Sequence, residues 1–303
     1  MMNAETHISK EVEAMILENA RLRVEIAAMG AELMHIYDKQ NQAELLWNGD
    51  PVYWKRRSPV LFPNVGKTYG NTVKINGRQY PTSQHGFARD SLFTCESSDA
   101  NRACFLLKSS PETLGKYPFD FELRIIYTLL EDALEVTWQV DNRSDAEMPF
   151  TIGGHPAFCF AAVDDVKTDY RLFFPGKDAL EYILLNPESG TALPDERRSL
   201  QLENGCLQLS DELFAHDALI FDGGQIGEVW LCDRSGARRV GMACPGFPNY
   251  GVWSVQGAAF VCLEPWMGRA DDHGFDLELS QKPNVNRLAP GSRFEKSYRI
   301  LLP

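Results

Sequence analysis

The sequence lacks any long apolar segment. None of its apolar runs approaches the roughly 20 residues that a membrane-spanning helix requires. The opening residues MMNAETHISKEVEAM are polar and acidic, unlike the apolar centre of a secretory signal. We therefore expect a cytoplasmic protein that is neither secreted nor inserted into a membrane.

Paired cysteines are missing as well. The seven cysteines include no CxxC pair, and they lie in apolar stretches such as NRACFLL and FVCLEPW. This usage is typical of reduced, buried thiols. A chain of this size buries roughly 75% of its unfolded surface, so it can fold stably without disulfides or structural metals.

Basic charge and the common cofactor motifs are also scarce. The net charge is −12, whereas nucleic acids and anionic membranes select basic patches. The sequence contains no P-loop, no GxGxxG after a strand and no GxSxG elbow. The most promising ionisable residues, His85, His155 and Glu264, show none of the spacings usual for zinc or iron ligands. We expect no metal, no cofactor and no nucleic-acid partner.

The sequence does contain alternating apolar and polar residues with a period of two. LRVEIAA places Leu22, Val24 and Ile26 on one face, and FELRIIYTLL and ALEVTWQV repeat this pattern. Such runs predict half-buried antiparallel strands.

Turn signals fit the same picture, and helical signals are few. Asn76-Gly77 is the favoured pair for a two-residue type I′ hairpin, and Ser235-Gly236 predicts another hairpin. SPETLGKY predicts a single helical turn capped by Ser110. We expect residues 1–20 to form a lead-in segment that is either a short helix or an extended chain.

Strand patterns recur about every ten to fifteen residues without the alternating helices of a parallel sheet. We therefore predict an all-β fold, a large antiparallel β-sandwich that forms a single domain over residues 1–303.

Three stretches combine ionisable residues with glycine, proline and aromatic residues. They are PNVGKTYG running on to SQHGFARD, then GGHPAF, and finally VCLEPWMGRADD. Candidate site residues in these stretches are Asn64, Lys67, His85, Arg89, His155, Glu264 and Trp266.

Glu264 lies in AAFVCLEPW, which predicts a strand that is apolar on both faces. A carboxylate there is costly to bury unless it is paired or used in chemistry. We expect Pro265 to end the strand and to hold Glu264 extended. His155 is confined by Gly153-Gly154, which can adopt positive φ and allow close approach of another group, and by Pro156. A rim ion pair and a turn histidine are the structural alternatives.

Taken in order, PVLFPNVGK, QHGFARD, TIGGHPAF, DALIFD, GVWS and CLEPWMGRADD resemble the aldose 1-epimerase (galactose mutarotase) family. The resemblance extends from about Leu22 to the closing LAPGSRFEKSYRILL, and it is greatest to a divergent branch in which HGFARD and GGHPAF replace the better-known histidine contexts. It implies a large antiparallel β-supersandwich that interconverts the α and β anomers of free hexoses without a cofactor.

The resemblance also implies roles for individual residues. Glu264 matches the general base for the anomeric hydroxyl, His155 the general acid for the ring oxygen, and His85 the histidine that binds and polarises the sugar. Asp217 matches the aspartate that accepts sugar hydroxyls, although nearby Asp222 competes for this match. Lys67 stands where relatives often carry arginine, which replaces a bidentate contact by a point charge.

Further substrate contacts are expected from Asn64 and Arg89, and from Trp253 and Trp266, whose rings suit the C–H face of a sugar. An unperturbed histidine is mostly neutral at pH 7. We therefore expect a neighbouring carboxylate, or the bound substrate, to raise the pKa of His155.

Two other interpretations stay open. A phosphorylated hexose would need converging cations, for which WKRRSP supplies Lys55, Arg56 and Arg57. A non-catalytic sugar-binding or sensing protein could use the same scaffold. In each case the partner is a small sugar, and the edges of a sandwich are compatible with a homodimer.

Overall fold

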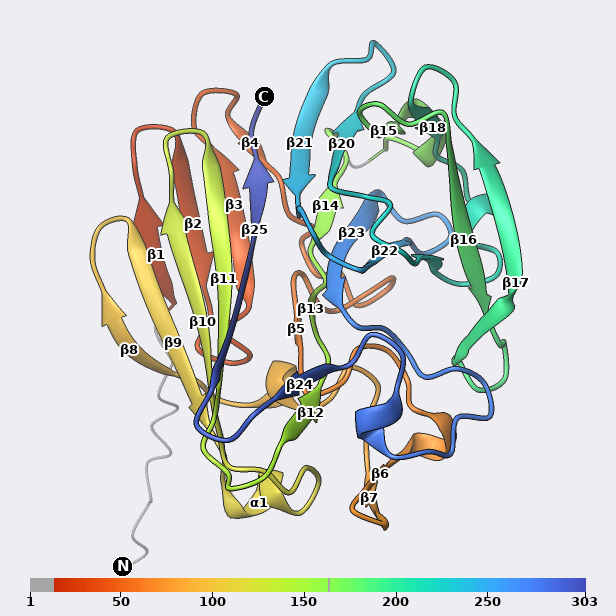
Figure 1. Cartoon of the computed structure of the whole chain (residues 1–303). Helices are drawn as coiled ribbons and strands as arrows, with labels where there is room; N and C mark the ends of the chain where they lie inside the picture. The colour runs from red at the N-terminus through yellow and green to blue at the C-terminus, as the bar shows by residue number, and fades with distance from the viewer. Residues whose placement is uncertain (1–13, 163) are drawn as a thin grey trace, which may run out of the picture.

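The computed structural model describes residues 14–162 and 164–303, and these residues form mainly antiparallel β-sheets (Figure 1). Most of the expected lead-in, residues 1–13, lies outside the described residues; the rest includes strand β1 at Met15–Glu18. No helix within the described ranges is long and apolar enough to cross a membrane.

One sheet of the described chain has nine strands in the order β18-β15-β20-β21-β25-β11-β10-β9-β8. Its strands are β8 (Thr94–Ser98), β9 (Arg102–Lys108), β10 (Phe121–Leu129), β11 (Ala133–Asn142), β15 (Arg171–Phe173), β18 (Cys206–Gln208), β20 (Glu228–Cys232), β21 (Arg238–Ala243) and β25 (Arg293–Leu301).

A second sheet carries the candidate site. It runs in the order β17-β16-β19-β22-β23-β13-β5, and β14 also pairs with β23. Its strands are β5 (Val60–Leu61), β13 (Ile152–Gly154), β14 (Ala157–Cys159), β16 (Ala179–Leu185), β17 (Ala192–Gln201), β19 (Leu219–Phe221), β22 (Asn249–Trp253) and β23 (Phe260–Met267).

Smaller elements complete the described fold. They are the sheet of β1 with β2 (Leu22–Ile26), β3 (Leu33–Asp38) and β4 (Ala43–Glu44), the pairs β6 (Thr72–Ile75) with β7 (Arg78–Pro81) and β12 (Met148–Phe150) with β24 (Asn286–Leu288), the short helix α1 (Pro111–Leu114), and single 3-10 turns at Tyr69–Asn71, Ala88–Asp90, Lys167–Asp169, Glu212–Phe214 and Leu279–Gln281.

The expected all-β antiparallel sandwich is confirmed, because the alternation of the sequence matches the burial of side chains. Leu22, Val24 and Ile26 are buried on β2, and the predicted apolar sets of β10 and β11 are buried as well. The Asn76-Gly77 hairpin joins β6 to β7 with positive φ at both residues, as a type I′ turn requires. Ser110 caps α1 as predicted.

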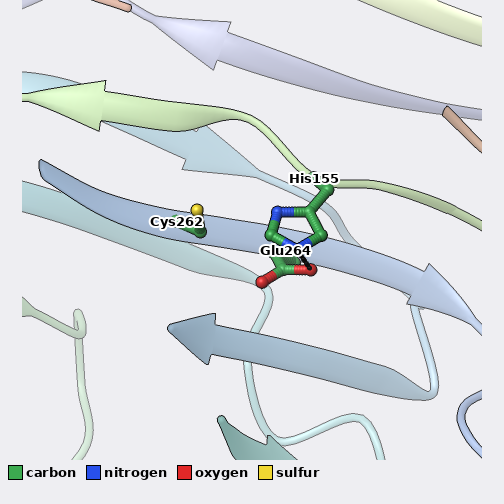
Figure 2. A group of neighbouring side chains, drawn as sticks. All are labelled: His155, Cys262 and Glu264. Carbon is green, nitrogen blue, oxygen red and sulfur yellow. Dashed lines mark ion pairs between the residues drawn. The ribbon is translucent and has the colours of Figure 1, made fainter. Parts of the chain in front are cut away.

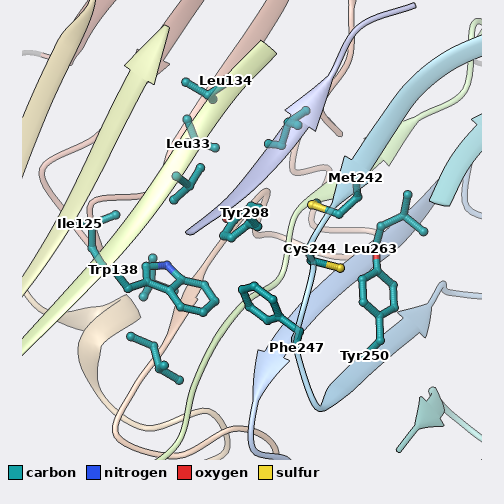
Figure 3. Packing of buried hydrophobic residues seen from close by; sticks show 14 of the residues in the cluster. Leu33, Ile125, Leu134, Trp138, Met242, Cys244, Phe247, Tyr250, Leu263 and Tyr298 are labelled. Atoms are coloured by element: carbon teal, nitrogen blue, oxygen red, sulfur yellow. The ribbon is translucent and has the colours of Figure 1, made fainter. Parts of the chain in front are cut away.

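A shared apolar core holds the sheets together (Figure 3). Trp138 of β11 and Tyr298 of β25 belong to it from the nine-stranded sheet, and Tyr250 of β22 and Leu263 of β23 join it from the other sheet. Successive side chains of a strand point to opposite faces. Leu263 therefore anchors β23 in the core while Glu264 points to the other face.

The expectation that Pro265 ends its strand is wrong, because β23 continues to Met267. Pairing between β23 and its neighbours β13 and β14 is interrupted. Strand β13 pairs with β23 at Ile152↔Met267 and Gly153↔Trp266, and β14 pairs with it again from Ala157↔Cys262 onwards. Pro265 falls in this gap, where its missing N–H breaks no ladder bond on that side.

Candidate active site

Strand register brings His155 and Glu264 together. The pairs Gly153↔Trp266 and Ala157↔Cys262 share one register, which sets His155 opposite Glu264 in the gap between them. His155 Nε2 lies 3.3 Å from Glu264 Oε2, and both side chains are buried (Figure 2). The two groups are therefore in direct contact, side by side, and do not face each other across a sugar-sized gap.

Aromatic rings enclose the imidazole of His155. Trp54 stacks on it with 4.8 Å between ring centroids, and Trp253 meets it edge-on at 5.7 Å. The backbone N–H of His155 donates to Pro59 O, and Ala157 N donates to Arg57 O, so residues 57–59 run beside the His155 segment. Because Trp54 shortly precedes residues 57–59 in the chain, these backbone bonds place it beside His155.

His85 forms the next part of the site, with its ring 5.4 Å from that of His155. Its backbone N–H donates to Gly66 O, and Gly66 N–H donates to His85 Nδ1 at 3.1 Å. An acceptor at Nδ1 leaves the proton of the neutral ring on Nε2. His85 is thus held as a hydrogen-bond donor.

These side chains line a cavity of about 830 Å³, which is within the range of small-molecule sites. Its walls come from the β13–β14 connection, the ends of β22 and β23, and the β16–β17 hairpin. The lining includes Trp54, Lys67, Gln84, His85, Arg89, His155, Arg198, His216, Asp217, Trp253, Glu264 and Trp266.

Glycines on the two neighbouring strands make room for Trp266. A Cβ at Gly153 of β13 or at Gly251 of β22 would collide with the indole of Trp266. Neither glycine has a positive φ. We expected Gly153 either to adopt positive φ or to allow close approach of another group. The fold uses the second property, because the indole of Trp266 packs directly against Gly153.

The predicted substrate-binding residues divide into two groups. Lys67, Arg89, Asp217, Trp253 and Trp266 line the cavity. Asn64 does not: its amide donates to Gly66 O and Ser83 O, both at 3.0 Å, and it borders a separate hollow of about 180 Å³. Its bonds brace the turn that holds His85.

The structure also separates the two competing aspartates. Asp222 accepts bonds from Arg269 Nε at 3.0 Å and from Asn249 Nδ2 at 2.7 Å, and it does not line the cavity. Asp217 lines it, with positive φ and one carboxylate oxygen accepting from Ala218 N–H.

The basic stretch WKRRSP does not supply its cations to the cavity. Arg56 pairs with Asp90 at 2.6 Å, and Arg57 donates to Met34 O. Sequence reasoning instead missed Trp54 and Arg198, which do line the cavity. The tryptophan within WKRRSP and the charged run DERR were visible, but nothing local linked either to His155.

Cys262 completes a group that could hold a metal ion. One ligand atom from each of Cys262, His155 and Glu264 lies within 4.8 Å of the others, and all three residues are buried (Figure 2). No local spacing in the sequence links this thiol to His155, because Cys262 lies on β23 and His155 on the β13–β14 connection.

Comparison with known proteins identifies the family. The family model for aldose 1-epimerase matches residues 13–188. Protein LacX (plasmid) of Lactococcus lactis subsp. lactis is 32% identical over 294 residues, which cover 94% of this chain and 98% of that protein. The chain belongs to the aldose 1-epimerase family.

Solved structures agree with this membership. A galactose mutarotase related enzyme from Lactobacillus acidophilus is 32% identical, with a TM-score of 0.90 and coverage of 96% of this chain and 97% of that one. A galactose mutarotase-like protein from Lactobacillus casei ATCC 334 is 26% identical, with a TM-score of 0.87 and coverage of 96% and 100%. These likenesses confirm the family resemblance and its divergent branch.

Burial controls the protonation of the paired groups in this aldose 1-epimerase family member. Burial raises the pKa of Glu264 well above its usual value, and the charge of Asp217 adds to this rise. Burial lowers the pKa of His155 to about 3. The expected rise in the His155 pKa is therefore wrong for the ligand-free cavity, because loss of hydration disfavours the charged imidazolium.

These shifts predict a pH-dependent stability effect of Glu264→Gln. Above pH 4.5, unfolded Glu264 loses its proton while the folded protein retains it, so this group makes the family member less stable as pH rises towards its folded pKa. Glutamine has no such loss. We therefore expect the unfolding free energy of the variant, relative to that of the wild type, to increase by up to about 1.4 kcal/mol for each unit by which the pH rises.

Urea unfolding of both proteins at several pH values between 4 and 8 measures this difference. The His155 contribution, which is lost as pH falls below about 6.5, is present in both proteins. A difference in unfolding free energy that does not change with pH would contradict the raised pKa of Glu264.

Proposed function

We propose that the protein is an aldose 1-epimerase that interconverts the α and β anomers of a free hexose, such as glucose or galactose, by general acid/base ring opening. The observation that carries the proposal is the contact of Glu264 with His155 in the wall of the large cavity. Family membership supports the same reaction class.

The contact suits the chemistry of a hemiacetal. Ring opening removes the proton from the anomeric oxygen O1 and delivers a proton to the ring oxygen O5, while the C1–O5 bond breaks and C1=O1 forms. O1 and O5 share one carbon, so the base and the acid must lie close together. Rotation about C1–C2 presents the other carbonyl face, and the reverse transfers close the ring.

Glu264 takes the proton from O1 and His155 gives a proton to O5 in this scheme. In the ligand-free cavity the opposing pKa shifts favour a protonated Glu264 and a neutral His155. Their contact allows the proton to pass from the carboxyl to the imidazole when a sugar hydroxyl approaches. The pair then holds one proton throughout the cycle, and the sugar gains and loses one.

The remaining cavity residues fit the recognition of a sugar. Trp253 and Trp54 offer flat surfaces for its C–H face. His85, held as a donor by Gly66, can bond to a sugar oxygen. Asp217 and Lys67 line the same cavity, where they can accept from and donate to hydroxyls.

The pH dependence of kcat/KM follows from the one-proton requirement. A second proton is added to the pair only near the lowered His155 pKa of about 3, and the last proton leaves only above the raised pKa of Glu264. We expect kcat/KM to stay level through pH 6.5, with an acid limb near pH 3. Polarimetry across this range, corrected for the buffer rate, measures it; an acid limb near pH 6.5 would contradict the assignment.

A phosphorylated hexose is the second candidate substrate. Lys67, Arg89 and Arg198 all line the cavity, and convergent cations are what a phosphate selects. Arg198→Ala should then weaken turnover of a hexose 6-phosphate and leave turnover of the free hexose unchanged.

Polarimetry with purified protein tests the proposal. Freshly dissolved α-glucose, α-galactose and their 6-phosphates should equilibrate faster than in buffer alone for at least one of them. Calorimetric binding of a sugar with no acceleration would instead identify a carbohydrate-binding protein on this scaffold.

A further inference from the structure

Cys262 lies beside His155 and Glu264 but is fully buried and does not itself line the cavity, and the acid/base reaction gives it no role. It precedes Glu264 by two residues on β23, so both side chains are on the same face of the strand. Figure 2 shows the imidazole of His155 over Glu264, with the thiol of Cys262 beside the pair. One donor atom of each residue lies within 4.8 Å of the other two.

These three donors match the preferences of zinc. Zn²⁺ binds thiolate sulfur, imidazole nitrogen and carboxylate oxygen, with bonds of about 2.0–2.3 Å. Such bonds bring tetrahedral ligand atoms about 3.3–3.7 Å apart, so the three donor atoms, which lie within 4.8 Å of one another, move closer when the ion binds. His155 and Glu264 line the cavity, which gives a metal ion a route of entry.

Unpartnered polar atoms give independent support. Among the described residues, His155 Nδ1 and Glu264 Oε2 are buried side-chain atoms without a hydrogen-bond partner. Glu264 Oε2 lies 3.3 Å from His155 Nε2. A buried polar atom without a partner is costly, and coordination to a cation would give Glu264 Oε2 a partner.

We propose that His155, Cys262 and Glu264 form a zinc-binding site whose occupation inhibits the enzyme. The metal takes the imidazole lone pair and the carboxylate oxygens, which are the groups that move protons, and binding releases the protons of the Cys262 thiol and the Glu264 carboxyl. Inhibition rests on the proposed function, whereas binding of the metal does not.

Binding is tested on the purified full-length protein after removal of metal with a chelator. Calorimetry with Zn²⁺ should give one site per chain, and Co²⁺ should produce a thiolate-to-cobalt charge-transfer band in the near ultraviolet. Zn²⁺ should also slow anomer interconversion, and a chelator should restore the rate. The cobalt band reports on the site even if no sugar turnover is found.

Cys262→Ser is the decisive variant, because it removes the sulfur and nearly keeps the shape. We expect it to lose the cobalt band, to raise the zinc concentration for half-inhibition at least about 10-fold, and to keep the metal-free rate within about twofold. Cys104→Ser, at another buried cysteine on β9 of the other sheet, is the matched control and should bind both metals as the wild type does.

The proposal is overturned if the wild type binds no zinc, if zinc accelerates the reaction, or if Cys262→Ser binds zinc as tightly as the wild type. Should Cys262→Ser fold poorly, His155→Asn provides the second test, because it must also lose zinc binding. Retained stoichiometric zinc binding in a folded His155→Asn variant would refute the site.

Discussion

Glu264→Gln should lower kcat at least ~10²-fold with little change in KM. General acid/base groups contribute roughly 10²–10⁴-fold each, and glutamine keeps the shape of the side chain but cannot take the proton from O1. Strand β23 is anchored in the core through Leu263, so the backbone at residue 264 should not move. The loss should therefore appear in the chemical step.

Polarimetry of anomer interconversion at saturating sugar measures this change. Asp38→Asn is a suitable control, since Asp38 is also a buried carboxylate but lies outside the cavity and accepts bonds from Arg21 Nε and Asn41 Nδ2. Its kcat should equal that of the wild type. Near-normal turnover by Glu264→Gln would remove Glu264 from the role of base.

His155→Asn should lower kcat by a similar factor. Asparagine is polar and fits the space, but it cannot deliver a proton to O5, and Glu264 loses the partner with which it exchanges the proton. The two side chains act as one unit, so the double variant Glu264→Gln/His155→Asn should lose little more than either single variant.

The control for this variant is another histidine–glutamate pair in the same chain. His35 Nδ1 lies 2.9 Å from Glu44 Oε2 on the small N-terminal sheet, where both side chains are partly exposed. His35→Asn should leave kcat unchanged. His85→Asn should alter both kcat and KM, because His85 is proposed to hold the sugar. Multiplicative losses in the double variant would contradict a shared proton between Glu264 and His155.

Local patterns were sufficient to predict much of the fold. Alternation identified β2, β10 and β11 because each strand presents one face to the core, and Asn76-Gly77 located a hairpin because few other pairs adopt positive φ at both positions. Pro265 was misread for a physical reason: the effect of a proline depends on whether its N–H is needed, and that depends on the partner strand.

The candidate site required long-range information at several points. The motifs pointed to Glu264 and His155, but their direct contact follows from the β14–β23 register, which no local pattern encodes. Trp54 reaches His155 through a neighbouring chain segment, and the lowered pKa of His155 results from burial by residues distant in sequence.

The most direct test of the account is a crystal structure of the Glu264→Gln variant soaked with a reducing hexose. The account predicts the sugar in the large cavity, with O1 within about 3 Å of the side chain of residue 264 and O5 within about 3 Å of His155 Nε2. A sugar bound with its anomeric carbon away from both side chains, or on another surface, would contradict it.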